Sequence, residues 1–218
     1  MPSPIAFSIL SILAGILLIV TSLFVTLAAI NIFSSSSYQG STTAQNAHRL
    51  LTIAASLGWS SLAVLIVVII AAVAGGGFSV SEVSDSLLSK DRLSREDLLL
   101  AYKGEKKLSS GNTMSIIVLI VLIILTIVSI LVGVLAAWAA IELGQLSTPD
   151  DPAKTAYSQA IIGAVASLGV IGLFIVATIV YFGIRNIRSE KLKDLQKLTD
   201  KAEERMGTEA KERLHLEN

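Results

Sequence analysis

The sequence predicts an all-α membrane protein: a four-transmembrane-helix bundle built from two tandem helix–loop–helix repeats, with amphipathic cytosolic helices. Three observations lead to this fold class: the composition, four long uncharged runs, and an internal sequence match. Of the 218 residues, 53% are hydrophobic and only 16% are charged, and the mean hydropathy is +0.72. Soluble domains are about 45–50% apolar and about 25% charged. The composition therefore indicates a protein that resides in a membrane.

The four runs are residues 5–33, 50–73, 114–141 and 160–183, and none contains Asp, Glu, Lys or Arg. About 20 apolar residues in a helix cross a hydrocarbon core of roughly 30 Å, so each run is long enough to span. We expect the first run to be a retained span and not a cleaved signal peptide, because no basic residue precedes it and it exceeds the 7–15 apolar residues typical of one.

Polar segments separate the runs. We expect loops at residues 34–48 and 143–158, the second marked by the turn sequence Thr-Pro-Asp-Asp-Pro. A charged segment with spaced leucines follows the second run, and it predicts short amphipathic helices. After the fourth run the helix should continue as a charged amphipathic tail and break at Gly207. The predicted domains are residues 1–78 (first two-span repeat), 79–113 (charged cytosolic linker), 114–185 (second two-span repeat) and 186–218 (charged helical tail).

An internal repeat relates the two halves. Ala-Ser-Leu-Gly at residues 55–58 recurs at 166–169, and Ala-Ala-Ile at 28–30 recurs at 139–141, both 111 positions later. We interpret the two matches at one offset as a duplication, with loops of equal length in the two copies. The alternative is convergent use of small residues, in which membrane helices are enriched.

The distribution of basic residues predicts the topology. Of the 17 Lys and Arg residues, 15 lie in the two charged segments, and the short loops carry only Arg49 and Lys154. Cytoplasmic loops hold the excess of Lys and Arg. We therefore expect a multi-pass protein with both termini in the cytosol. A cluster of cations beside the fourth span is the predicted membrane-surface anchor: Arg185, Arg188, Lys191 and Lys193.

The residues offer little chemistry. No Asp, Glu, Lys, Arg or His lies in the central part of a run, where an ionisable group would suggest a function. Cysteine is absent, which excludes disulfides and thiolate metal sites, and the two histidines lie in different segments. We predict no catalytic, cofactor or metal site, and the zero net charge argues against nucleic acid as a partner.

What remains is helix packing. Small residues spaced by four allow close approach of helices in lipid, and their hydroxyls can bond across the contact. The predicted helix-packing residues are Thr52, Ser56, Gly58 and Ser60 in the second run, and Gly163, Ser167 and Gly169 in the fourth.

These features favour a non-enzymatic protein with a structural or organising role. It would associate with itself or with another membrane protein in the lipid bilayer and present its cytosolic helices to a partner. A pore-forming channel or small-solute transporter subunit is the alternative, because an oligomer could line a wet pore with hydroxyl groups. The sequence is compatible with a cellular membrane, intracellular or plasma, and with a virion internal membrane.

The topology is testable by proteolysis. A protease added to sealed vesicles with the cytosolic side outward should cut near Lys103 and Lys107, because the predicted linker faces the cytosol. Mass spectrometry of the fragments would locate the cut. Full protection of this segment would overturn the orientation.

Overall fold

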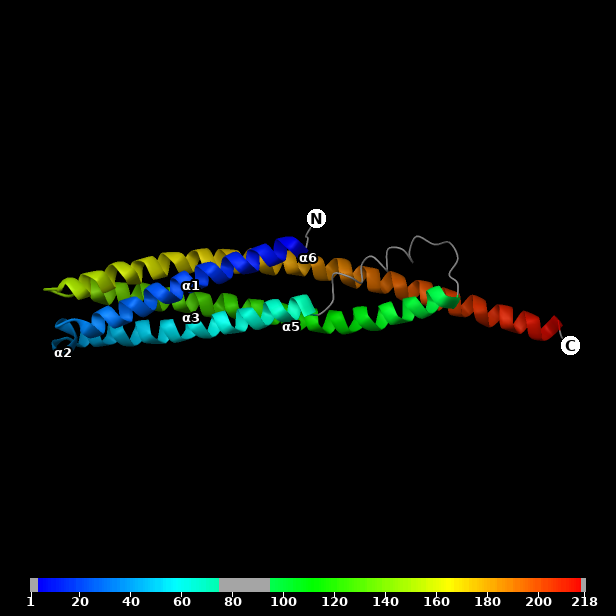
Figure 1. Cartoon of the computed structure of the whole chain (residues 1–218), viewed down its shortest axis with the longest axis horizontal. Coiled ribbons are helices and arrows are strands. Elements are labelled where there is room, and N and C mark those ends of the chain that lie inside the picture. Colours follow the sequence, from blue (N-terminus) through cyan, green and yellow to red (C-terminus); the bar gives the residue numbers. More distant parts are fainter. Residues whose placement is uncertain (1–3, 75–94, 217–218) are drawn as a thin grey trace. The chain divides into compact units, whose positions relative to one another are not determined.

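A computed structural model describes residues 4–74 and 95–216, and helices form every element in these ranges. The helices are α1 (Pro4–Ser34), α2 (Ser37–Gly40), α3 (Thr42–Ala74), α5 (Arg95–Gly144) and α6 (Asp151–Leu216), drawn in Figure 1. By its contacts the chain divides into two compact units, residues 1–69 with 119–180, and residues 70–118 with 181–218. The predicted all-α class is confirmed.

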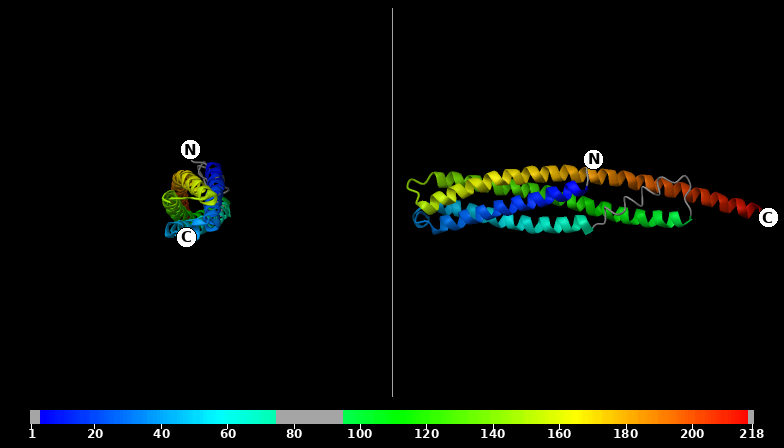
Figure 2. Two further views of the ribbon diagram at one scale, coloured as in Figure 1. Left: turned by 90° about the vertical axis from the view of Figure 1, so that its left-hand side faces the viewer. Right: turned by 45° about the horizontal axis from the view of Figure 1, so that its top comes forward.

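The first unit is a bundle of four long helices, α1, α3 and parts of α5 and α6. Figure 2 shows them side by side from two further directions. Each includes a segment that is long and apolar enough to cross a membrane; the four begin at Ile5, Thr42, Ser115 and Asp151. The four predicted spans are thus present as helices, consistent with a multi-pass membrane protein.

Buried residues follow a seven-residue pattern in all four helices. Their spacing alternates between three and four, as in Leu51, Ala54, Gly58, Ser61 and Leu65 of α3. This is the pattern of helices that pack at a small angle with interlocking side chains. The corresponding buried positions elsewhere are 7, 11, 14, 18, 21, 25, 28 and 32 in α1, 115 to 143 in α5 and 153 to 181 in α6.

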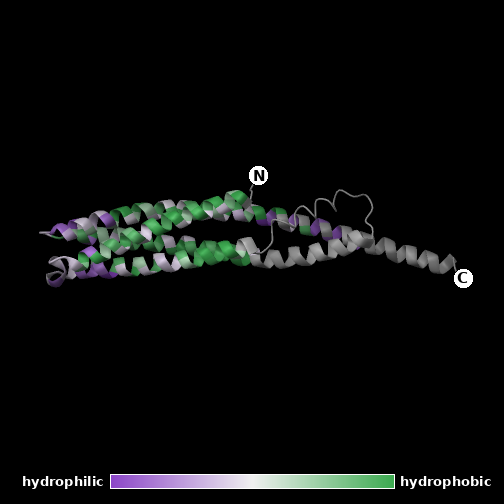
Figure 3. Ribbon diagram, viewed as in Figure 1, coloured by the Kyte–Doolittle hydropathy of each residue, from purple (hydrophilic) through white to green (hydrophobic). Residues whose placement is uncertain are grey.

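The bundle has small residues inside and large ones outside. Alanine supplies twelve of the seventeen residues in the core cluster nearer the loops. A second cluster, farther from the loops, is built around larger side chains such as Leu18, Leu65 and Phe174. The exterior is mostly Ile, Leu and Val, for example Ile16 (55% exposed) and Ile179 (65% exposed), and Figure 3 shows hydrophobic residues along the four helices. Such an exterior suits lipid as the solvent.

The helices are longer at the loop end than the polar sequence suggests. We predict loops at 34–48 and 143–158, but α3 already begins at Thr42 and α6 at Asp151. The reason is burial: Ala44 and Ala47 in one hairpin, and Ala153 and Ala156 in the other, continue the packed core beyond the apolar runs. The predicted loop boundaries are therefore wrong by about two helical turns at the start of each second helix.

The second unit contains the end of α3, the first part of α5 and the last part of α6. Here α5 joins the charged segment to the third span without a break, and α6 continues through Gly207, where we predict an end. Residues 79–94 of the predicted linker lie outside the described residues, as do the side chains between 95 and 114. The amphipathic character of the charged helices remains a prediction.

Each hairpin of the first unit contains one close contact between a glycine and a serine. A Cβ atom built on Gly58 of α3 would collide with the Ser22 hydroxyl of α1, and one built on Gly133 of α5 would collide with the Ser167 hydroxyl of α6. Ser22 lies 111 residues before Gly133, and Gly58 lies 109 before Ser167. The same contact therefore occurs in both hairpins with the two residue types exchanged.

Because the glycine and the serine are exchanged between the hairpins, the effect of exchanging them by mutation in the first hairpin can be predicted. Gly58→Ser alone should destabilise the bundle by about 1–3 kcal/mol, because the added atoms overfill a closed contact. Combining it with Ser22→Gly reproduces the arrangement of the other hairpin and should restore most of the lost stability. Thermal unfolding in detergent measures both.

The matched control is Gly172→Ser, because a Cβ there has nothing within 4 Å. It should leave the melting temperature unchanged. A double variant no more stable than Gly58→Ser would show that this contact does not set the distance between α1 and α3.

Candidate functional site

Three of the predicted helix-packing residues lie in the core of the first unit. Gly58 and Ser167 form the two close contacts described above. Gly163 is buried against α1, where an added Cβ would lie 2.7 Å from Val25 Cγ2. These three residues bring pairs of helices together within one chain.

The other four are exposed. The hydroxyls of Thr52, Ser56 and Ser60 donate to backbone carbonyls four residues earlier, at 2.8 Å, 2.9 Å and 2.8 Å. Their polar stripe thus lies on the outer face of α3, with its donors satisfied by its own helix. Gly169 is also exposed, although a Cβ there would collide with Leu17 of α1.

The two hairpins share one burial pattern, but at two offsets. Buried positions of α1 recur in α5 after 111 residues, as Ala28 does at Ala139. Buried positions of α3 recur in α6 after 109, as Ala54 does at Gly163. The connection between the helices is therefore two residues shorter in the second hairpin, and the expected equal loop lengths are wrong.

This shift separates the two copies of Ala-Ser-Leu-Gly. Gly58 is buried and Gly169 is exposed, whereas Ser56 is exposed and Ser167 is buried. The motif that indicates a repeat in the sequence thus does not occupy equivalent places in the bundle. In the sequence, the seven-residue spacing of small residues along the second and fourth runs is the signal that indicates the offset of 109 between α3 and α6.

A carboxylate joins the two loops. Asp150 Oδ1 accepts from the Ser35 hydroxyl (2.7 Å) and the Ala153 amide (3.1 Å), and Oδ2 accepts from the Ser36 amide and hydroxyl (both 2.8 Å). It therefore caps the start of α6 and holds the end of α1 as well. The hydroxyls of Ser35 and then Ser36 are the main reasons that the pKa of Asp150 lies far below its usual 3.8.

Polar side chains next to the loops mark one level of the bundle. The Asn31 amide nitrogen donates to the Gln159 side-chain oxygen (2.8 Å) between α1 and α6. On α5, the Trp138 indole nitrogen donates to Glu142 (3.3 Å), and Arg49 is exposed on α3. These residues border the apolar runs, as groups at a membrane–water boundary do.

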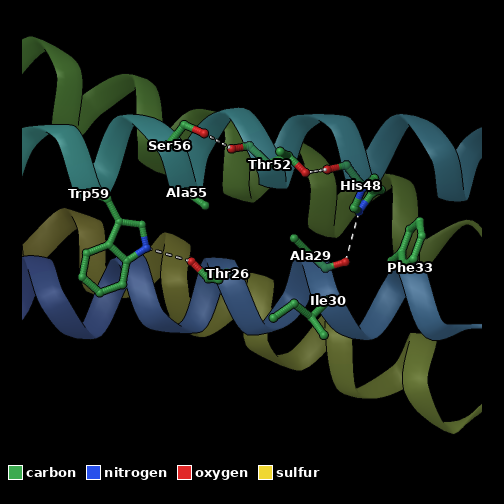
Figure 4. A pocket seen from close by; sticks show the side chains of 9 residues that line it. All are labelled: Thr26, Ala29, Ile30, Phe33, His48, Thr52, Ala55, Ser56 and Trp59. Carbon is green, nitrogen blue, oxygen red and sulfur yellow. Dashed lines mark hydrogen bonds between the residues drawn. The ribbon is translucent and has the colours of Figure 1, made fainter.

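A groove of about 470 Å³ opens between α1 and α3. Figure 4 shows its walls, with Ala29 and Ile30 from α1 and Thr52 and Ser56 from α3. Trp59 closes one end, where its indole nitrogen donates to the Thr26 hydroxyl (3.1 Å). We call this hollow the first groove.

His48 lies at the loop end of the first groove. Its Nδ1 is 3.1 Å from the Ala29 carbonyl oxygen, and because a carbonyl only accepts, Nδ1 carries the proton. The ring also packs against Phe33 and Tyr38, with centroids 5.4 Å and 5.3 Å away. The imidazole is thus held in place by the Ala29 carbonyl and by the rings of Phe33 and Tyr38.

A second groove of about 510 Å³ opens between α5 and α6. Its four lining residues on α5 lie 111 positions after those of the first groove, and its four on α6 lie 109 positions after. These residues are Ala137, Ala140, Ile141, Gly144, Tyr157, Ile161, Ala164 and Val165. Tyr157 takes the place of His48, and Gly144 that of Phe33. The hairpins therefore carry equivalent hollows with different chemistry at the loop end.

The predicted membrane-surface anchor lies on α6 in the second unit. Arg185 is half-buried and its Nε has no hydrogen-bond partner in the described structure, and Lys193 is exposed. Arg188 and Lys191 are on the same helix, with side chains outside the described part. Among the described residues, no three His, Cys, Asp or Glu side chains gather as a metal site would require.

Compared with protein-family models, with curated proteins and with solved structures, the chain matches none of them. The fold and its grooves therefore carry the functional argument.

The hydrogen bonds that Asp150 accepts from Ser35, Ser36 and Ala153 predict that the stability of the fold depends on pH. The pKa of the folded-state carboxyl is lowered, so its stabilising effect is present above about pH 4 and is lost as the pH falls toward the folded value. The melting temperature should fall more between pH 5 and pH 3 in the native protein than in Asp150→Asn. Scanning calorimetry or nanoscale fluorimetry would measure it.

Asp151→Asn is the matched control. Asp151 is the next residue, the first of α6, but its carboxylate pairs only with the exposed Lys154 (3.5 Å), a contact worth little in water. It should keep the native pH profile. If the melting temperatures of the native protein and Asp150→Asn fell equally with pH, the hydrogen bonds of Asp150 would not be the cause of the fall.

Proposed function

We propose that the chain is a non-enzymatic integral membrane protein with a structural or organising role, which assembles laterally in the bilayer. One observation carries the proposal. Both hairpins expose small residues at matched positions of their second helix: Ser60 and Ala63 on α3, and Gly169 and Gly172 on α6. Elsewhere the exterior is mostly large and aliphatic, and small exposed residues allow close approach by another helix in lipid.

The matched grooves and core contacts support a duplication as the origin of the two halves. Its register is 111 residues for the first helix of each hairpin and 109 for the second. Both connections then lie on one side of the membrane. We propose that the charged helical segments lie on the cytosolic side with both termini, in accordance with the excess of Lys and Arg there.

A channel subunit is the second candidate, favoured by the exposed hydroxyls of Thr52, Ser56 and Ser60. The interior of one bundle is filled by alanines and close contacts, for example between Gly133 and Ser167. A pore would therefore have to form between several copies, with this stripe on its wall.

The first experiment measures mass and conductance on one sample in a native-like membrane. We expect a defined oligomer without conductance. Ser60→Leu and Gly172→Leu should shift it to smaller species without lowering the monomer melting temperature, because both sites point outward. Val165→Leu, also exposed, is the control that should not change the mass.

A native protein that stays monomeric at high protein-to-lipid ratio would contradict the proposal. A conducting ring that loses conductance on Ser56→Leu would make the channel the correct function instead.

A further inference from the structure

We propose that the first groove binds one acyl chain of an anionic glycerophospholipid from the loop-side leaflet, with the phosphate held by Arg49. This goes beyond lateral assembly, since it assigns a ligand to a single copy. The groove's wall belongs to helices whose exterior suits lipid, so a hydrocarbon chain is the occupant that its surroundings supply.

The length of the groove fits one leaflet. Its α3 wall runs from His48 to Trp59, which lie eleven positions apart, or about 16 Å along a helix. Half of a hydrocarbon core roughly 30 Å thick is about 15 Å. The indole of Trp59, bonded to Thr26, closes the groove at the depth where a chain from one leaflet ends.

Arg49 lies above the groove on the same helix face. It precedes Thr52 and Ser56, two groove-lining residues, by three and seven positions, which places all three on one side of α3. Helical side chains lean toward the N-terminus, and here that direction leads toward the loop and the headgroup layer. The side chain is exposed, and the described structure contains no ion pair to it.

The two grooves differ in the net charge of the residues at their loop ends. Residues 31–49 contain one Arg and no acid, a net charge of +1 with His48 neutral. Residues 142–158 contain three acids and one Lys, a net charge of −2. Asp150, which reaches toward the first hairpin, already accepts four hydrogen bonds from Ser35, Ser36 and Ala153. An anionic headgroup is therefore favoured at the first groove and disfavoured at the second.

The test uses Trp59 as the reporter. The chain has two tryptophans, so Trp138→Phe leaves Trp59 alone. The protein is reconstituted in phosphatidylcholine bilayers doped with a lipid that carries bromine on its acyl chain, which quenches a nearby indole. The brominated lipid has either a phosphatidylglycerol or a phosphatidylcholine headgroup with the same chain.

We expect phosphatidylglycerol to reach half-maximal quenching at about five-fold lower mole fraction, the preference that one basic residue near a headgroup confers. Arg49→Gln should abolish this preference. Ser56→Phe, which fills the groove, should reduce quenching by both lipids, whereas Val165→Phe at the equivalent place in the second groove should not. With Trp59→Phe and Trp138 retained, no headgroup preference is expected.

Equal quenching by the two lipids in the Trp59 protein would overturn the proposal, as would a preference that survives Arg49→Gln and so arises from other cations. Absence of quenching by either lipid, with loss of oligomer in Ser56→Phe, would show that a second copy fills the groove.

Discussion

Close approach of helix backbones is the constraint on which this structure depends. Lipid tails are as apolar as leucine, so burying apolar surface does not drive helices together inside a bilayer; packing contacts do. Each hairpin meets this need with one glycine beneath one serine hydroxyl, as at Gly58 and Ser22. Alanines continue the contact toward the loops. Large aliphatic side chains therefore lie on the exterior, where their apolar surface suits lipid.

The ends of the bundle are held by a different kind of interaction. At the loop end, hydrogen bonds add to the packing of the alanines: Asp150 joins both connections and Asn31 bonds to Gln159. The same level carries the groups that differ between the hairpins, His48 in one and Tyr157 in the other. The two hairpins, which share one burial pattern, thus differ in the chemistry of their loop ends.

The four spans could be predicted from the sequence because uncharged apolar runs of this length rarely occur outside membrane helices. The starts of α3 and α6 could not, since the alanines that extend the core stand among Thr, Gln and Asn and look like loop. Of the predicted packing residues, Gly58, Gly163 and Ser167 lie in contacts within the chain. The partners of Gly58 and Ser167, however, are Ser22 and Gly133 on the first helix of the same hairpin, which we did not predict. Pairing across helices is a three-dimensional property that no linear offset reveals. The grooves could not be predicted from the sequence either, because each is lined by residues from two helices.

The two-residue difference between the connections has a consequence for how the motif should be compared between copies. A helix turns by about 100° per residue, so a shift of two rotates a motif by about 200° and reverses its side. Ser56 and Ser167, which occupy the same place in the motif, therefore have opposite surroundings: Ser56 is exposed on the outside of the bundle and Ser167 is buried inside it. A substitution at Ser56 thus changes the surface of the bundle, whereas one at Ser167 changes the packing of its interior.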